Sequence, residues 1–229
     1  MKAKTSSGGL LLLSVALLII SNTAGAGVIA GSAHDFTSTG SGGSTWNVAG
    51  TTQQVCAICH TPHKADTATS AAALWNHTNS VQSYQLYTST TMKATLSQPG
   101  PSSKLCLSCH DGTVAVDSFG GNTGTHTIAT SSRRNLGAAA LNDDHPIGFT
   151  YDATLVTANG SLHDTSRAVT IGSSPTKTDT ISNLLLYGGK MECSSCHDVH
   201  NTFVVGANGT GMVKIATAGS AICLACHNK

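Results

Sequence analysis

Large side chains are scarce in this sequence. Aromatic residues make up only 4% and charged residues only 10% of its 229 residues, whereas Gly, Ala, Ser and Thr fill long stretches. Such a composition offers little material for an apolar core built from side chains alone. We therefore expect either partial disorder or a core that is filled by something other than side chains.

The sequence also lacks an excess of either charge, because Lys and Arg total 12 while Asp and Glu total 11. Without a basic surplus, nucleic-acid binding is disfavoured. No apolar run is long enough to cross a bilayer, which takes about 20 residues. The run at 10–20 follows Lys2 and Lys4 and precedes the small residues TAGA, a pattern typical of a secretory signal peptide.

We predict cleavage of this signal peptide (residues 1–26) near Ala26. The mature chain, residues 27–229, is then a single exported domain with no membrane span. Its expected location is extracellular or at the cell surface, with the periplasm as the alternative. An uncleaved membrane anchor is the other interpretation of residues 10–20.

No cysteine is left over from one repeated pattern. The pattern is Cys-x-x-Cys-His, and it defines motif one (56–60), motif two (106–110), motif three (193–197) and motif four (223–227). This is the signature of c-type haem attachment. Its two thiols add to the two vinyl groups on one porphyrin edge, and the histidine that follows binds the iron. Zinc sites, redox dithiols and disulfides are the alternatives, but none requires that histidine.

The motifs therefore predict four covalently attached haem c groups. The attachment residues are Cys56, Cys59, Cys106, Cys109, Cys193, Cys196, Cys223 and Cys226. The proximal iron ligands are His60, His110, His197 and His227. Haem is a large apolar group that can replace the missing core side chains. We expect a mostly irregular fold organised around the haems, with short helices at the motifs, long loops and little sheet.

Motifs one and three carry a second histidine, His63 and His200, in the pattern C-x-x-C-H-x-x-H. Motifs two and four lack it, so the order is A-B-A-B and indicates an internal duplication. An imidazole three residues beyond a proximal ligand cannot reach the far face of its own haem. We therefore predict that His63 and His200 are distal ligands of adjacent haems, with the B partner of each pair as the favoured target.

Further distal ligands are needed if every iron is six-coordinate. The candidates are His145 in NDDHPIGF, His34 in GSAHDF and His77 in LWNH. Five distal candidates for four irons leave one surplus. The other two histidines, His126 and His163, lie in Gly-, Ser- and Thr-rich stretches, and we expect them to be exposed. Methionine is an alternative ligand, but none of the mature chain's methionines lies in a recognisable ligand setting.

Several segments of the chain resemble a known family. The segments CAICHTPH, LWNHTNS, KLCLSCHDGTVAVDSFGG, DDHPIGFTY and GGKMECSSCHDVHN are similar to the doubled-CxxCH family of multihaem c-type cytochromes. In particular they resemble extracellular tetrahaem filament-forming (nanowire) cytochromes of the OmcE type. The resemblance implies bis-histidine ligation, stacked haems and a homopolymer in which one distal histidine comes from the adjacent subunit. By its position, His34 would be that donor.

The function expected from these residues is electron transfer and not catalysis, because six-coordinate irons leave no position for a substrate. Electrons would pass from redox partner cytochromes along the haems of an extracellular conductive filament to an external acceptor. A monomeric periplasmic shuttle is one alternative. The other is an oxidoreductase for a small nitrogen or sulfur oxyanion, which needs an open haem beside basic residues such as Arg133 and Arg134.

Overall fold

The computed structural model describes residues 29–37, 54–129, 135–137, 140–200, 202–205 and 211–228. The predicted signal peptide, Arg133 and Arg134 lie outside these residues. Within the described part of the chain, no helix is both long enough and apolar enough to cross a membrane.

The helices are short. They are α2 (Pro101–His110), α3 (Ala153–Asn159), α4 (Ile181–Leu185), α5 (Cys193–Cys196), α6 (Ala221–Leu224) and the 3-10 helix η2 (Ala218–Ser220). Helix α2 begins with proline, whose fixed φ suits the first helical position and whose missing N–H is not needed there. Helix α3 ends at Gly160, which has a φ of 68°, the left-handed conformation that favours glycine.

Within the described residues, the strands form three two-stranded sheets. Strands β1 (Gln85–Leu86) and β2 (Ala140–Leu141) are parallel, β3 (Phe149–Thr150) and β6 (Lys190–Met191) are antiparallel, and so are β4 (Ala168–Ile171) and β5 (Lys177–Thr180). In the β4–β5 hairpin, Ala168 pairs with Thr180 and Ile171 with Lys177. Strand β4 alternates exposed and buried residues and so turns one face toward the core.

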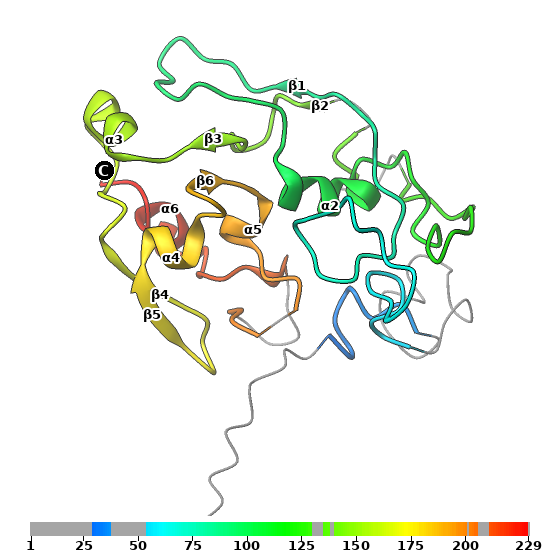
Figure 1. Ribbon diagram of the computed structural model, residues 1–229. Coiled ribbons are helices and arrows are strands. Elements are labelled where there is room, and N and C mark those ends of the chain that lie inside the picture. Colours follow the sequence, from blue (N-terminus) through cyan, green and yellow to red (C-terminus); the bar gives the residue numbers. More distant parts are fainter. Residues whose placement is uncertain are drawn as a thin grey trace, which may run out of the picture.

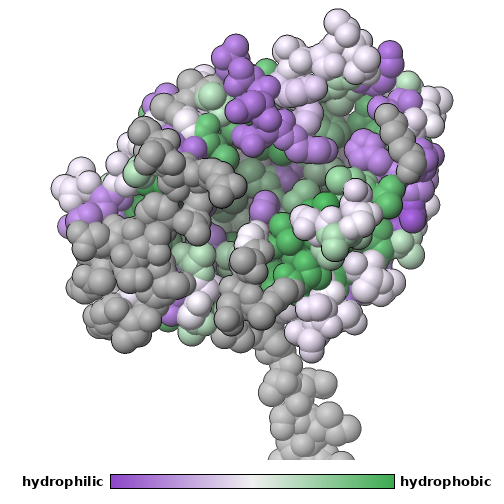
Figure 2. Space-filling view, turned by 180° about the vertical axis from the view of Figure 1, so that it is seen from behind, coloured by the Kyte–Doolittle hydropathy of each residue, from purple (hydrophilic) through white to green (hydrophobic). Residues whose placement is uncertain are grey.

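The described chain falls into a first half, up to residue 129, and a second half, from residue 135. The two halves lie side by side, and α2 and α5 pack against each other where the halves meet (Figure 1). The largest apolar cluster lies in the second half: Phe149, Tyr151, Leu155, Val169, Ile171, Ile181, Leu184, Leu185, Met191 and Ala225. The other two clusters are smaller: Phe36, Ile58, Val116 and Ile128, and then Tyr84, Leu107 and Leu141. Apolar residues also reach the surface between polar ones (Figure 2).

The expected fold class, short helices with little sheet, agrees with the described residues. Helices accompany motifs two, three and four, but motif one forms turns where we expected a helix. Its backbone is closed by hydrogen bonds from the N–H groups of Cys59 and His60 to the carbonyl of Cys56, at 3.2 and 2.8 Å. Val55, which precedes Cys56, has no side-chain oxygen that could cap a helix.

Candidate haem-binding sites

All eight motif cysteines are free thiols, as attachment to a vinyl group requires. Successive motifs are neighbours through their thiols: Cys59 with Cys109, Cys106 with Cys193, and Cys196 with Cys226. Burial raises the pKa of Cys59 and of Cys226 to about 11. The four motifs therefore form one continuous group that runs through the molecule in chain order.

The proximal histidines of motifs one and three are held in the same way. Nδ1 of His60 donates to the carbonyl of Ala73, and Nδ1 of His197 donates to the carbonyl of Gly211, both at 2.7 Å. Because a carbonyl only accepts, Nδ1 must carry the proton in each ring. Nε2 is then the nitrogen with a lone pair, as an iron ligand requires.

The backbone around these two histidines is also duplicated. The N–H of Thr61 donates to the carbonyl of Leu74, and the N–H of Asp198 donates to the carbonyl of Met212, both at 2.9 Å. Leu74 and Met212 both have positive φ, at 58° and 48°, an uncommon conformation for residues other than glycine. The repeat between motifs one and three thus extends well beyond the shared sequence letters.

Two histidine pairs have a spacing that suits axial ligation. The ring centres of His60 and His200 are 6.2 Å apart with an interplanar angle of 18°, and those of His34 and His110 are 6.1 Å apart with an angle of 58°. Two imidazoles on opposite sides of one metal, each bonded at about 2 Å, have ring centres about 6.3 Å apart. Each pair joins a proximal histidine to one of the predicted distal candidates.

The position of His200 differs from the favoured expectation. We expected it at the neighbouring B motif, whereas it lies beside the proximal histidine of the other A motif. The segment 29–37 brings His34 to motif two. Buried Phe36 packs into the cluster with Ile58 and Val116, and the carboxylate of Asp35 accepts N–H bonds that shape the turn.

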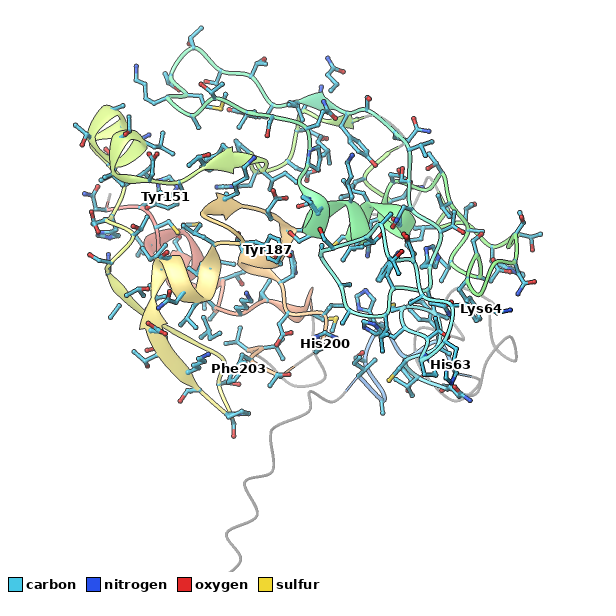
Figure 3. The ribbon with its side chains drawn as sticks, viewed as in Figure 1. His63, Lys64, Tyr151, Tyr187, His200 and Phe203 are labelled. Carbon is cyan, nitrogen blue, oxygen red and sulfur yellow. The ribbon has the colours of Figure 1, made fainter. Side chains whose placement is uncertain are left out.

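The remaining distal candidates lie elsewhere. His63 and His145 are exposed, and no ring contact involving either one is found within the described residues. His63 lies with Lys64 toward one edge of the molecule, apart from His200 (Figure 3). His145 is bonded through Nδ1 to the carbonyl of Pro146 at 2.9 Å.

His77 is buried, with 3% of its surface exposed. Its Nδ1 is 2.8 Å from the carbonyl oxygen of Thr78, and its Nε2 is 3.1 and 3.2 Å from those of Ala115 and Val116. Burial lowers its pKa, and the carbonyl hydrogen bonds partly oppose that shift. Both ring nitrogens therefore face backbone acceptors of the first half.

Sequence reasoning missed the junction between motifs two and three. Glu192, only 2% exposed, accepts the N–H of Gly100 at 3.2 Å to each oxygen and also the hydroxyl of Ser103. The same side chain caps α5 in a capping box with Ser195. One carboxylate thus joins the N-termini of α2 and α5. The sequence feature that could have indicated this junction is a single acidic residue directly before CSSC.

A second missed group follows motif two. Asp111 is 1% exposed and accepts hydrogen bonds from the Ser80 and Tyr84 hydroxyls and from Thr113. Burial is the main cause that raises the pKa of Tyr84, to about 12. This network fixes the chain directly after the proximal ligand His110.

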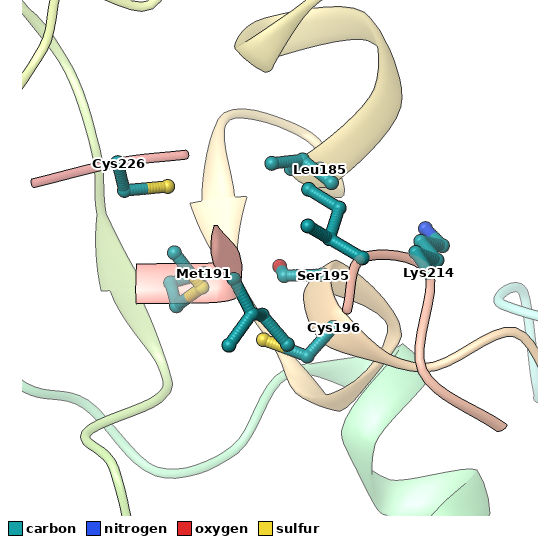
Figure 4. A pocket seen from close by; sticks show the side chains of 8 residues that line it. Leu185, Met191, Ser195, Cys196, Lys214 and Cys226 are labelled. Atoms are coloured by element: carbon teal, nitrogen blue, oxygen red, sulfur yellow. The ribbon is translucent and has the colours of Figure 1, made fainter. Parts of the chain in front are cut away.

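A small pocket lies between motifs three and four (Figure 4). Its lining includes Cys196, Cys226, Met191, Leu185 and Lys214. Thiols from two successive motifs thus share one mainly apolar recess, which is the environment that a porphyrin edge needs.

A zinc interpretation finds no support in the described residues, where no group of three or more His, Cys, Asp or Glu side chains is arranged to hold a metal ion. The donor set suits haem instead. Each motif offers two free thiols beside a histidine. Two of the predicted proximal rings are oriented through Nδ1. Two of them, His60 and His110, have the ring centre of a second imidazole 6.2 and 6.1 Å away.

Comparison with known proteins gives one match. Residues 188–229, which hold motifs three and four, match the family model of the doubled CXXCH motif. Neither the curated proteins nor the solved structures yield a match. The CXXCH motifs indicate covalently bound haem c, and the match supports a multihaem c-type cytochrome family for this chain, with electron transfer as its expected activity.

Proposed function

We propose that this chain is an exported tetrahaem c-type cytochrome that carries electrons from haem to haem and polymerises into an extracellular conductive filament. The observation that carries this proposal is the continuous group of four Cys-x-x-Cys-His motifs, whose thiols are neighbours in chain order. Haems attached in this order would offer electrons a path from one motif to the next. The matched pair of motifs in 188–229 supports the same interpretation.

Haem, when bound, supplies a one-electron iron couple. The chain's own residues hold and orient it: the eight cysteines fasten it, and carbonyls fix the proximal rings of His60 and His197. His200 and His34 would be the second axial ligands at motifs one and two, which their short ring distances to His60 and His110 support. With both axial positions filled by protein, no site is left for a substrate, which favours electron transfer over catalysis.

We assign His77 as the surplus candidate, because carbonyl oxygens already face both its ring nitrogens. Exposed His63 and His145 then remain to serve motifs three and four. In a filament, one of these two histidines belongs to the iron of the adjacent subunit. The resemblance suggested His34 as the histidine donated to the adjacent subunit. We propose His63 or His145 in its place, because His34 lies beside His110 of its own chain.

The monomeric periplasmic shuttle is the second candidate. It is favoured by the packing of the N-terminal segment onto its own chain, through Phe36 and the Asp35 turn. An oxyanion oxidoreductase gains no such support, since the basic pair that it would use lies outside the described residues.

The test begins with the protein made in a host that attaches haem c in its exported compartment. Intact mass should show four haems on a chain that starts near residue 27, and the spectrum should change reversibly on reduction. Cryo-electron microscopy of protein sheared from the native cell surface then decides between filament and shuttle. Filaments with a histidine crossing between subunits support the polymer, whereas discrete particles alone leave the shuttle. A chain without covalent haem overturns both.

A further inference from the structure

The sites after motifs one and three share a hydrogen bond but differ in charge. Near motif one, Nδ2 of Asn76 donates to the carbonyl of Ala57 at 2.5 Å. Near motif three, Nζ of Lys214 donates to the carbonyl of Ser194 at 2.6 Å. Ala57 and Ser194 each follow the first cysteine of their motif. The same bond is therefore made by a neutral amide in one half and by an amine in the other.

The backbone shows that Asn76 and Lys214 are equivalent. The N–H of Asn76 donates to the carbonyl of Cys59 at 2.9 Å, and the N–H of Lys214 donates to the carbonyl of Cys196 at 2.8 Å. Both carbonyls belong to the second cysteine of an A motif. Each residue also follows an antiparallel bridge to its proximal histidine, His60 with Trp75 and His197 with Val213.

The amine of Lys214 is held by backbone carbonyls, and burial and a nearby carboxylate act on its charge in opposite directions. A second carbonyl, that of Leu184, accepts from Nζ at 3.0 Å. Burial lowers the pKa of Lys214, while the carboxylate of Asp198 opposes that shift. The Asp198 carboxylate in turn accepts N–H bonds from His200, Thr202 and Phe203. The Lys214 side chain also lines the pocket between motifs three and four (Figure 4).

We propose that Lys214 raises the reduction potential of the haem at motif three above that of the haem at motif one, so that electrons collect in the second half of the chain. The inference rests on the proposed function. Reduction adds one electron from a donor protein or an electrode to ferric iron, and a cation nearby stabilises the added negative charge. A unit charge about 10 Å away, at an effective dielectric constant of about 20, changes the equilibrium by about tenfold.

The test is a spectroelectrochemical titration of the holoprotein with all haems attached. Lys214→Met keeps the length and apolar stem of the side chain and removes its charge. We expect one transition to move to lower potential, with a reduction equilibrium about tenfold less favourable, which is about 59 mV for a one-electron couple. Lys214→Arg keeps the charge and should leave the potentials near those of the wild type. Asn76→Lys should move a different transition upward.

The proposal is overturned if Lys214→Met binds its full complement of haem and leaves every transition in place. It is also overturned if Lys214→Arg lowers a potential as much as Lys214→Met, because packing and not charge is then the cause. Haem content by intact mass separates these results from failure of the proposed function. A wild-type chain without covalent haem overturns the function and this inference together.

Discussion

The chain after motif one and the chain after motif three make the same turn with different residues. Each returns to its motif through a positive-φ residue, a carbonyl bonded to the proximal histidine and a bond to the second cysteine. Apart from the motif letters, the residues that close the two turns differ. The shared features are therefore backbone features, set by the need to orient an imidazole through its Nδ1.

The differences between the two sites lie in the side chains that surround this common backbone. Val55 precedes motif one, whereas Glu192 precedes motif three. At the returning strand, Asn76 and His77 correspond to Lys214 and Ile215. The first site thus has a neutral amide and a buried histidine, and the second has a cation and an aliphatic residue. If each site holds a haem, as we propose, a duplicated scaffold of this kind would let the two haems differ in stability and in potential.

The variant with the largest expected effect removes one histidine of the pair at motif one. We expect His200→Ala to leave one ferric haem five-coordinate, because His200 is the imidazole that faces His60 at ligand spacing. A high-spin signal should appear in the electron paramagnetic resonance spectrum, and the midpoint potential of that haem should rise.

His126→Ala is the control for this variant. His126 is bonded through Nδ1 to Asp117 at 2.8 Å, away from the ring pairs, so its loss should leave every haem in the spin state of the wild type. If the His200→Ala spectrum instead equals the wild-type spectrum, the pairing of His60 with His200 is wrong. The matched variant His63→Ala should affect only assembled protein if His63 serves a neighbouring subunit.

The next prediction compares how much the residue before each of the two motifs contributes to the free energy of unfolding. Glu192→Ala removes the carboxylate that joins α2 and α5, leaving the Gly100 N–H and the Ser103 hydroxyl without their buried acceptor. We expect the free energy of unfolding to fall by about 2–4 kcal/mol. The equivalent change at motif one, Val55→Ala, removes only two methyl groups from a half-buried residue and should cost about 1 kcal/mol.

Denaturant unfolding of the two holoproteins, followed by far-ultraviolet circular dichroism, measures this difference. Equal losses for both variants would mean that Glu192 does not join the two halves. A loss that is confined to Glu192→Ala would show that the junction between motifs two and three depends on one carboxylate.

The haem signature could be predicted from the sequence because it is local. Four repeats of Cys-x-x-Cys-His that use every cysteine leave little room for another chemistry, and the scarcity of large side chains indicated short elements around a non-protein core. The prediction of a helix at motif one was wrong, because residues 55–59 form turns. The helix at motif two begins at Pro101, and the helix at motif three has a capping box formed by Glu192 and Ser195.

The distal ligands could not be assigned from spacing, because ligation is a long-range contact. Recurrence of the second histidine indicated a role for His200 but not its partner, which lies in the other half of the chain. The sequence made both His77 and His34 candidates. In the structure His34 lies beside His110, whereas backbone carbonyls face both ring nitrogens of His77. The charge difference between Asn76 and Lys214 becomes visible only when the two turns are compared in space.

The smallest expected effect concerns pH and the buried histidine of the first site. Burial lowers the pKa of His77 below its ordinary value of 6.5, so the unfolded chain binds a proton more readily than the folded one. Stability is therefore retained above about pH 6.5 and is lost as the pH falls below it. His77→Ile, which copies Ile215 of the second site, should remove this part of the pH dependence. Unfolding midpoints of the holoprotein measured between about pH 7 and pH 5 would decide the matter: parallel curves for the wild type and His77→Ile would show that protonation of His77 is not linked to folding.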